Sequence, residues 1–132
     1  KDWLSIKSSF DVLSNRPSWI WASPANRARE TGELLSTAYQ ATLVLERSLY
    51  LANKHEIIDC LRSTPAQEFN VALIAHNPGI SDLANALSRT TSYCSLNLNP
   101  WGVAHFNYTG HWTHVSEGSL PPPKLYDLDQ FN

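Results

Sequence analysis

The sequence predicts an α/β protein: a three-layer α/β/α sandwich with a mostly parallel central sheet and an antiparallel C-terminal hairpin at one edge. Short apolar segments alternate with longer amphipathic segments through most of the chain. This order is typical of parallel strands joined by helices that cover both faces of a sheet. After Ser88 the pattern changes to two strand-like segments around Thr109-Gly110, and this change predicts the hairpin.

The bulk composition indicates one ordinary globular domain over residues 1–132. Apolar residues make up 42% of the chain, too many for a disordered protein. The net charge of -2 gives no reason to expect a nucleic-acid or membrane partner. The longest apolar run, Val71–Ala75, is far too short to span a bilayer, and the N-terminus lacks a signal-peptide pattern. We therefore expect a cytoplasmic protein, with Cys60 and Cys94 as free, buried thiols.

The first half of the chain predicts two helices and two strands. Apolar residues recur at helical spacing over Asp2–Leu13, and Ser18–Ala22 is typical of a buried strand. Ser23-Pro24 then predicts a helix start, with Ser23 as the N-cap. This helix should continue to about Tyr39, and Thr42–Leu45 predicts the next strand. The face of this helix that packs on the sheet is expected to contain Ala28, Thr31, Leu34, Leu35 and Ala38.

The second half predicts two more helices and the most convincing central strand. Asn53 begins a helix that ends before Pro65, and Val71–Ala75 predicts the strand. Pro78-Gly79 leads into the last helix. Its inward residues are expected to be Ile80, Leu83, Ala84 and Leu87.

The C-terminal region predicts the hairpin and a last short strand. Val103–Tyr108 and Trp112–Val115 are the predicted hairpin strands, and Leu125–Leu128 is a predicted edge segment. We interpret Pro121-Pro122-Pro123 as a stiff connector before this segment; a ligand for a proline-reading module is the alternative.

Two strand-to-helix junctions carry the candidate functional residues. One contains Arg27 and the other contains His76. Ligands of open α/β sheets bind at the carboxyl ends of strands, where helix N-termini favour anions. An arginine fork suits bidentate phosphate contact, and an imidazole can donate to a phosphate or exchange a proton with it. The alternatives are a surface ion pair of Arg27 with Glu30 or Glu33, and a structural role for His76 in the core.

The two junctions also resemble motifs of a known family. Ser23–Thr31 resembles the S-P-x-x-R-A-x-x-T stretch of the phosphoglycerate mutase-like histidine phosphatase superfamily. Val71–Gly79 resembles its hydrophobic strand followed by G-H-N-P-G, with Ala75 in place of the first glycine. Leu49–Ala52 and the short length fit the phosphohistidine phosphatase branch.

This resemblance implies a metal-independent phosphatase with no cofactor, in which a nucleophilic histidine is phosphorylated and then hydrolysed. It implies that Arg27 and His76 act in catalysis, with Arg27, His76 and Asn77 binding the phosphoryl group and Ser23 capping the helix at the site. The expected substrate is a phosphorylated protein carrying phosphohistidine, or a small phosphoester. The alternatives are a sugar-phosphate phosphatase or mutase, and a noncatalytic module that binds phosphate or a peptide.

One part of the family pattern is absent. The family nucleophile lies in an Arg-His-Gly or Arg-His-Ala motif after the first strand, and this sequence contains no Arg-His pair. We interpret the chain as N-terminally incomplete, with the nucleophile outside it; a pseudoenzyme is the alternative.

The remaining polar candidates are weaker. Glu46 follows a strand end and is the best candidate for a general acid. A zinc site could involve Glu117 and the C-terminal histidines, but their spacing matches no metal motif, so we expect no metal there. The histidines concerned are His105, His111 and His114. His55 is expected to be solvated in the first turn of a helix.

Overall fold

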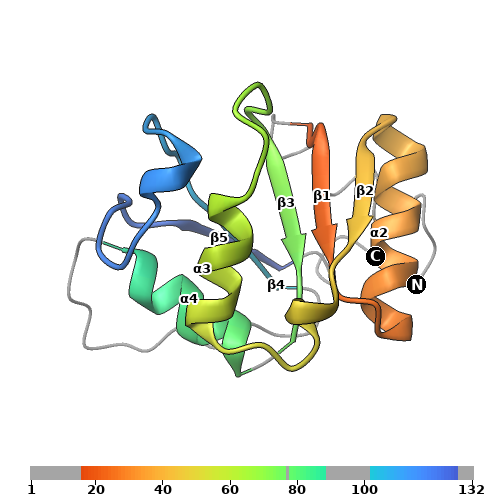
Figure 1. The fold of residues 1–132 in the computed structure, drawn as a ribbon, viewed down its shortest axis with the longest axis horizontal. Coiled ribbons are helices and arrows are strands. Elements are labelled where there is room, and N and C mark those ends of the chain that lie inside the picture. The colour runs from red at the N-terminus through yellow and green to blue at the C-terminus, as the bar shows by residue number, and fades with distance from the viewer. Residues whose placement is uncertain (1–15, 77, 89–101, 128–132) are drawn as a thin grey trace.

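The computed structural model describes residues 16–76, 78–88 and 102–127 (Figure 1). Three predictions lie outside the described residues: the helix Asp2–Leu13, the phosphate ligand Asn77 and the thiol Cys94. All remaining predicted elements fall wholly or mainly within the described ranges.

The central sheet has three parallel strands in the order β2-β1-β3. These are β1 (Trp19–Ala22), β2 (Thr42–Leu45) and β3 (Val71–Ile74), and they confirm the three strands predicted for this part of the chain. The last residue of β1, Ala22, lies opposite the last residues of its two neighbours, Leu45 and Ile74. The carboxyl ends of all three strands therefore meet at one edge.

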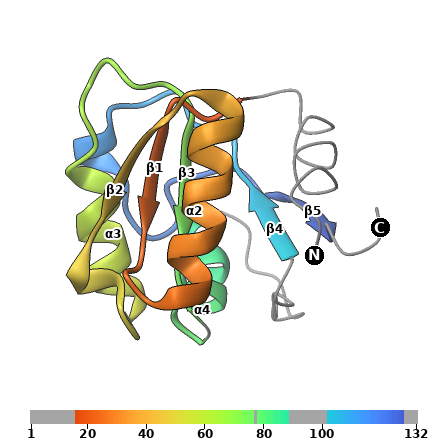
Figure 2. The ribbon, with the colours of Figure 1, turned by 90° about the vertical axis from the view of Figure 1, so that its right-hand side faces the viewer.

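Helices cover both faces of this sheet, which confirms the three-layer α/β/α arrangement. In Figure 2, α2 (Asn26–Tyr39) lies on one side of the strands and α3 (Lys54–Arg62) lies on the other. The α4 helix (Gly79–Leu87) packs beside α3. Alternate strand residues enter two separate cores: Ile20 packs with Leu35 on the α2 side, and Trp21 packs with Ile57 on the α3 side. This alternation is what a strand buried on both faces requires.

The α2 helix begins later than predicted. Its N-cap residue is Ala25, so the prediction that Ser23 is the N-cap is wrong. The backbone of β1 continues to pair for one more residue, because Ser23 N donates to Ile74 O at 3.0 Å. Ser23 therefore stays in line with the strand, and the helix cannot start until the chain has turned. Further along α2, Gly32 allows close packing, since a Cβ there would lie 3.2 Å from the Cβ of Ala22.

The predicted start of α3 is confirmed. Asn53 accepts a hydrogen bond from Glu56 N at 2.9 Å, and the Glu56 carboxylate accepts one from Asn53 N at 3.1 Å. This reciprocal pair is a capping box, which satisfies two backbone donors that a helix N-terminus would otherwise leave unpaired.

The C-terminal region is antiparallel, but its pairing differs from the prediction. Strand β4 (Gly102–His105) pairs with β5 (Lys124–Asp127), and the two form a separate two-stranded sheet. The hairpin partner predicted at Trp112–Val115 is therefore wrong. Residues 121–123 lie directly before β5, as expected of a connector.

The segment after Gly110 forms a 3-10 helix, η2 (Trp112–His114), and its inward-facing positions are Trp112 and, three residues later, the C-cap residue Val115. Trp112 packs against the α3-side core and its Nε1 donates to Glu68 O at 2.7 Å, while Val115 is 1% exposed. A 3-10 helix has three residues per turn, so it turns both side chains inward. In a strand, Trp112 would instead have shared its face with His114, and His114 is exposed.

No helix in the described part of the chain is long and apolar enough to cross a membrane.

Candidate functional site

The carboxyl edge of the sheet brings together the two junctions that the sequence singled out. Strands β1 and β3 are direct neighbours, so the residues after Ala22 and after Ile74 lie side by side. Glu46, the first residue after β2, joins the same edge through its backbone N–H, which donates to Ala22 O at 2.9 Å. Parallel strands commonly present their ligand sites at this edge.

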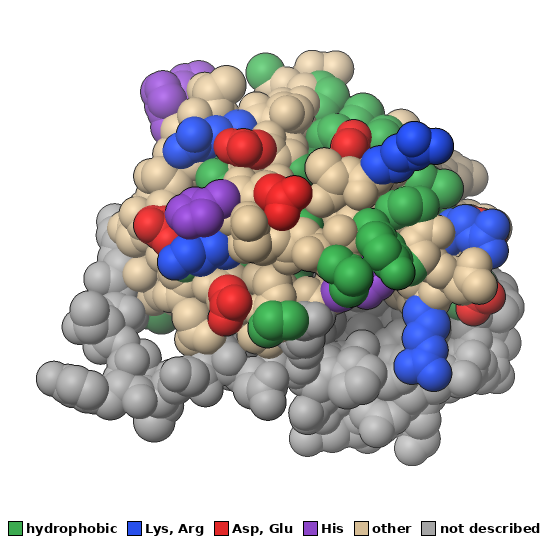
Figure 3. All heavy atoms as spheres, turned by 60° about the horizontal axis from the view of Figure 1, so that its bottom comes forward, with side chains coloured by type: hydrophobic (Ala, Val, Ile, Leu, Met, Phe, Trp, Pro, Cys, Tyr) green, Lys and Arg blue, Asp and Glu red, His purple; other side chains and the backbone are tan. Residues whose placement is uncertain are grey.

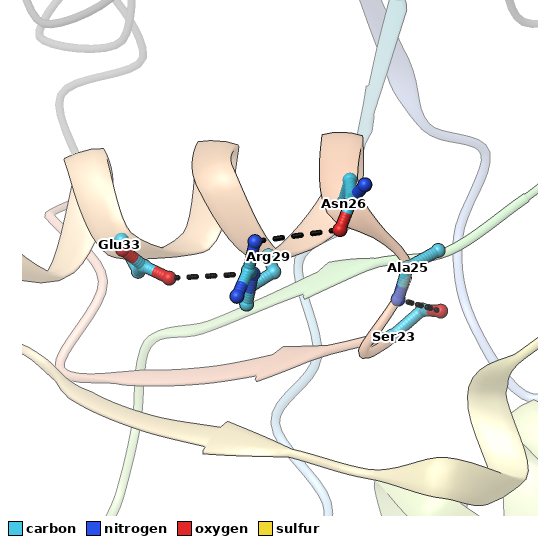
Figure 4. A network of polar contacts seen from close by, with 5 residues as sticks. All are labelled: Ser23, Ala25, Asn26, Arg29 and Glu33. Atoms are coloured by element: carbon cyan, nitrogen blue, oxygen red, sulfur yellow. Dashed lines mark hydrogen bonds and ion pairs between the residues drawn. The ribbon is translucent and has the colours of Figure 1, made fainter.

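A hydrogen bond joins the two junctions directly. His76 Nε2 lies 2.7 Å from Ser23 Oγ, although the two residues are 53 positions apart in the chain. Ser23 is fully buried and His76 is partly buried. Ser23 Oγ also accepts a hydrogen bond of 3.3 Å from Ala25 N, which Figure 4 shows at the turn into α2. The serine predicted as a helix cap thus holds both the helix entrance and the histidine.

Tyr50 is a second contact of His76, and no sequence pattern indicated that it belongs to the site. The two ring centroids are 5.7 Å apart and the ring planes are inclined by 76°, an edge-to-face arrangement. The Tyr50 side chain is 57% exposed, whereas the preceding Leu49 is fully buried. Leu49 is the last residue of the 3-10 helix η1 (Arg47–Leu49), and its buried side chain anchors this segment. Tyr50 follows it and faces out beside His76.

Arg27 lies in the first turn of α2, at the same edge, and is exposed. The alternative expected from the sequence, an ion pair with Glu30 or Glu33, is not found between these described residues. Glu33 instead lies 3.6 Å from Arg29 Nε, and Arg29 also donates to Asn26 Oδ1 at 3.4 Å (Figure 4). The guanidinium of Arg29 is therefore directed along α2, and in the described chain no side chain pairs with Arg27.

Two solved structures share this arrangement of elements. One is described as "Putative Phosphohistidine Phosphatase SixA" from Nakamurella multipartitia, with a TM-score of 0.75 and 18% identity over 92% of this chain and 80% of that chain. The other carries the same description, from Agrobacterium tumefaciens, with a TM-score of 0.54 and 20% identity over 63% of this chain and 53% of that chain.

The chain has the fold of these two SixA structures. At 18% and 20% identity, these structural similarities show the fold alone. No family model and no curated protein matches the sequence.

The structure gives no contact between the Glu46 side chain and His76. Its carboxylate caps η1, where Oε1 lies 3.3 Å from Ser48 N and 3.1 Å from Ser48 Oγ. The carboxylate of Glu46 therefore has a structural role at this edge, and general-acid chemistry would require it to leave that cap.

The C-terminal histidines lie elsewhere in the fold. His111 and His114 are exposed, and their ring centroids are 5.8 Å apart. His105 ends β4, and the carboxylate of Glu117 pairs with Lys54 Nζ at 2.7 Å. Within the described residues no group of three or more His, Cys, Asp or Glu side chains is arranged to hold a metal ion. His55 is exposed in the first turn of α3, as expected.

Proposed function

We propose that the carboxyl edge of the β2-β1-β3 sheet binds a phosphoryl group between His76 and Arg27. The observation that carries this proposal is the 2.7 Å hydrogen bond between His76 and Ser23, which joins the two junctions at the entrance of α2. A helix N-terminus offers unpaired N–H groups and a partial positive charge. An anion is therefore the ligand that this edge favours.

Arg27 supplies the full positive charge of the proposed site. Side chains in a helix lean toward its N-terminus, so the guanidinium of a first-turn arginine reaches back toward the strand ends. Its planar fork suits two oxygens of one phosphoryl group. Glu33 does not compete for it, because its carboxylate lies 3.6 Å from Arg29 Nε. Asn77 is a further proposed phosphate ligand on the ground of its position next to His76 in the sequence.

The proposed activity is metal-independent hydrolysis of phosphohistidine in a protein. In the first step the P–N bond of the substrate breaks as a nucleophilic histidine forms a new P–N bond. Water then breaks that bond, which releases phosphate and restores the histidine. The fold shared with two proteins described as "putative phosphohistidine phosphatase SixA" supports this proposal.

The proposed nucleophile lies outside this chain, because the sequence contains no Arg-His pair. We propose that it reaches the phosphoryl group at the carboxyl edge of the sheet, where the residues after β1 and β3 lie side by side.

Phosphohistidine fits this edge better than a sugar phosphate does. Once its imidazole is protonated, the leaving group departs without an enzymic acid. The contacts that the structure gives to the His76 ring come from Ser23 and Tyr50, and neither is a carboxylic acid. Tyr50 and Leu51 are exposed at this edge, 57% and 68% respectively, and offer apolar surface to a protein substrate (Figure 3 shows apolar side chains beside a histidine on this face).

The test uses the whole natural protein that contains this chain. It is incubated with a phosphohistidine peptide and with phosphosugars in the presence of a metal chelator. We expect phosphate release from phosphohistidine, reduced about a hundredfold or more by Arg27→Ala because charge stabilisation of the transferring group is lost. Arg29→Ala is the matched control and should retain activity, since Arg29 is directed at Glu33.

The alternatives have their own outcomes. Turnover of phosphosugars without turnover of phosphohistidine would favour the sugar-phosphate phosphatase or mutase. Phosphate binding without turnover and without a phosphorylated protein intermediate would favour the noncatalytic module.

A further inference from the structure

We propose that Ser23 is a positioning residue that selects one tautomer of His76: the ring is unprotonated at Nε2 and carries its hydrogen on Nδ1. The Nδ1–H group would then donate to the phosphoryl oxygen. This second step rests on the proposed function, whereas the assignment of the tautomer rests only on the contacts of Ser23.

The direction of the hydrogen bond follows from the bonds that the Ser23 hydroxyl makes. A hydroxyl can donate one hydrogen bond and accept two. Ser23 Oγ accepts from Ala25 N at 3.3 Å, so its own hydrogen still needs an acceptor. Ser23 is fully buried, and a buried donor without a partner is costly. Within the described residues its remaining contact is His76 Nε2, at 2.7 Å.

If Nε2 carried the hydrogen instead, the imidazole would donate to Ser23 Oγ. The serine hydrogen would then have no acceptor among the described residues, in a position that water does not reach. The arrangement that satisfies every buried group has the serine hydroxyl donating to Nε2. A neutral imidazole has one N–H and one acceptor nitrogen, so its hydrogen is then on Nδ1.

The backbone fixes this pair before any ligand arrives. Ser23 follows β1 and His76 lies two residues after β3, and Ser23 N donates to Ile74 O at 3.0 Å. The Tyr50 ring, which is in edge-to-face contact with the imidazole of His76, restrains it on another side. The structure gives Nδ1 no hydrogen-bond partner within the described part of the chain, so this is the nitrogen available for a ligand.

The chemical consequence is that a neutral His76 presents a donor to an anion. The hydrogen bond that one ring nitrogen of a histidine makes commonly determines which nitrogen carries the hydrogen and faces the ligand. Without Ser23, the ring could rotate or exchange tautomers, and an unprotonated nitrogen facing a phosphoryl oxygen would repel it.

The first measurement is a proton–nitrogen correlation spectrum of the His76 ring in the wild-type chain, without phosphate, at a pH where the imidazole is neutral. We expect the pattern of the Nδ1–H tautomer. A predominant Nε2–H pattern would overturn the proposal, and this outcome needs no variant.

The second measurement compares three variants of the same chain. Ser23→Ala should lose the Nδ1–H pattern and weaken inorganic phosphate binding about tenfold, the effect of losing one well-placed hydrogen bond. Ser23→Thr keeps the hydroxyl and should restore both. Ser63→Ala removes an exposed serine hydroxyl that donates to Asp59 O at 3.0 Å, and it should change neither.

The two proposals fail in different ways. An unchanged tautomer in Ser23→Ala, with phosphate still bound, would overturn the role of Ser23 and leave the phosphate site intact. The expected tautomer in a wild-type chain that does not bind phosphate would overturn the proposed function and the donor role of Nδ1, and would leave the tautomer assignment intact.

Discussion

Cys60 illustrates how one residue's surroundings determine its chemistry. Its side chain lies on the inner face of α3 and is 6% exposed. Burial raises the pKa of the thiol to about 12, and the negative charge of Glu46 adds to the increase. A thiol with this pKa is protonated, and therefore unreactive, at any pH that the folded protein would normally meet.

The raised pKa of Cys60 makes stability depend on pH. Because the folded pKa lies above the ordinary thiol value, the unfolded state loses its proton first as the pH rises. The free energy of unfolding should therefore be unaffected below the ordinary value and should fall as the pH rises toward about 12. Urea denaturation at several pH values compares the single variant Cys94→Ser, which keeps Cys60, with the double variant that also carries Cys60→Ala. The difference between their free energies of unfolding isolates the effect of the Cys60 thiol. Identical pH dependence in both proteins would contradict it.

Gly79 is required by a close approach between two segments. A Cβ at this position would lie 1.9 Å from the carbonyl oxygen of Ala52, which is a backbone atom and cannot rotate away. We expect Gly79→Ala to lower the free energy of unfolding by about 2 kcal/mol, as overpacked cores do. Urea denaturation measures this, with the exposed Glu30→Ala in α2 as the control. A loss no larger than that of the control would show that the two segments separate easily.

At the scale of elements, the capping box of α3 is the clearest link between sequence and local stability. Asn53→Ala should cost about 1 kcal/mol, because Glu56 N loses its acceptor. Asn53→Ser keeps an acceptor oxygen and should retain most of the stability. Both values come from urea denaturation, and equal losses in the two variants would indicate that the cap contributes through packing instead.

The predicted strands and helices agree with the structure where burial is regular. β2 has the predicted bounds, and β1 and β3 each lie within one residue of theirs, because a strand apolar on both faces has few alternatives in sequence. The segment at Trp112–His114 was predicted wrongly because its inward residues are set by the surface of α3. A single short segment gives little indication of period, so tertiary packing decided it.

The start of α2 shows a similar limit. Ser23-Pro24 has the usual chemistry of a helix start, yet β1 and β3 continue to pair as far as Ser23. Strand pairing between distant segments outweighed the local preference. The same pairing brings Ser23 within hydrogen-bond distance of His76, which local sequence patterns cannot reveal.

At the scale of the whole molecule, the parallel sheet brings the ends of β1, β2 and β3 to one edge. The sequence predicted that Arg27 and His76 follow two different strands, and the structure shows that these strands, β1 and β3, are neighbours. It did not indicate the Tyr50 contact, since Tyr50 is 26 residues from His76 and belongs to a different connection. Residues on separate connections meet only once the strand order is known.

The central claim is that Arg27 and His76 form one anion site, and titration with inorganic phosphate tests it most directly. Calorimetry on the wild-type chain, Arg27→Ala, His76→Ala and the double variant gives the coupling between the two residues. We expect each single variant to weaken binding about tenfold or more, because charge-assisted hydrogen bonds are lost, with Arg29→Ala unchanged. Binding that is equally strong in Arg27→Ala, or equally weakened by Arg29→Ala, would contradict the claim.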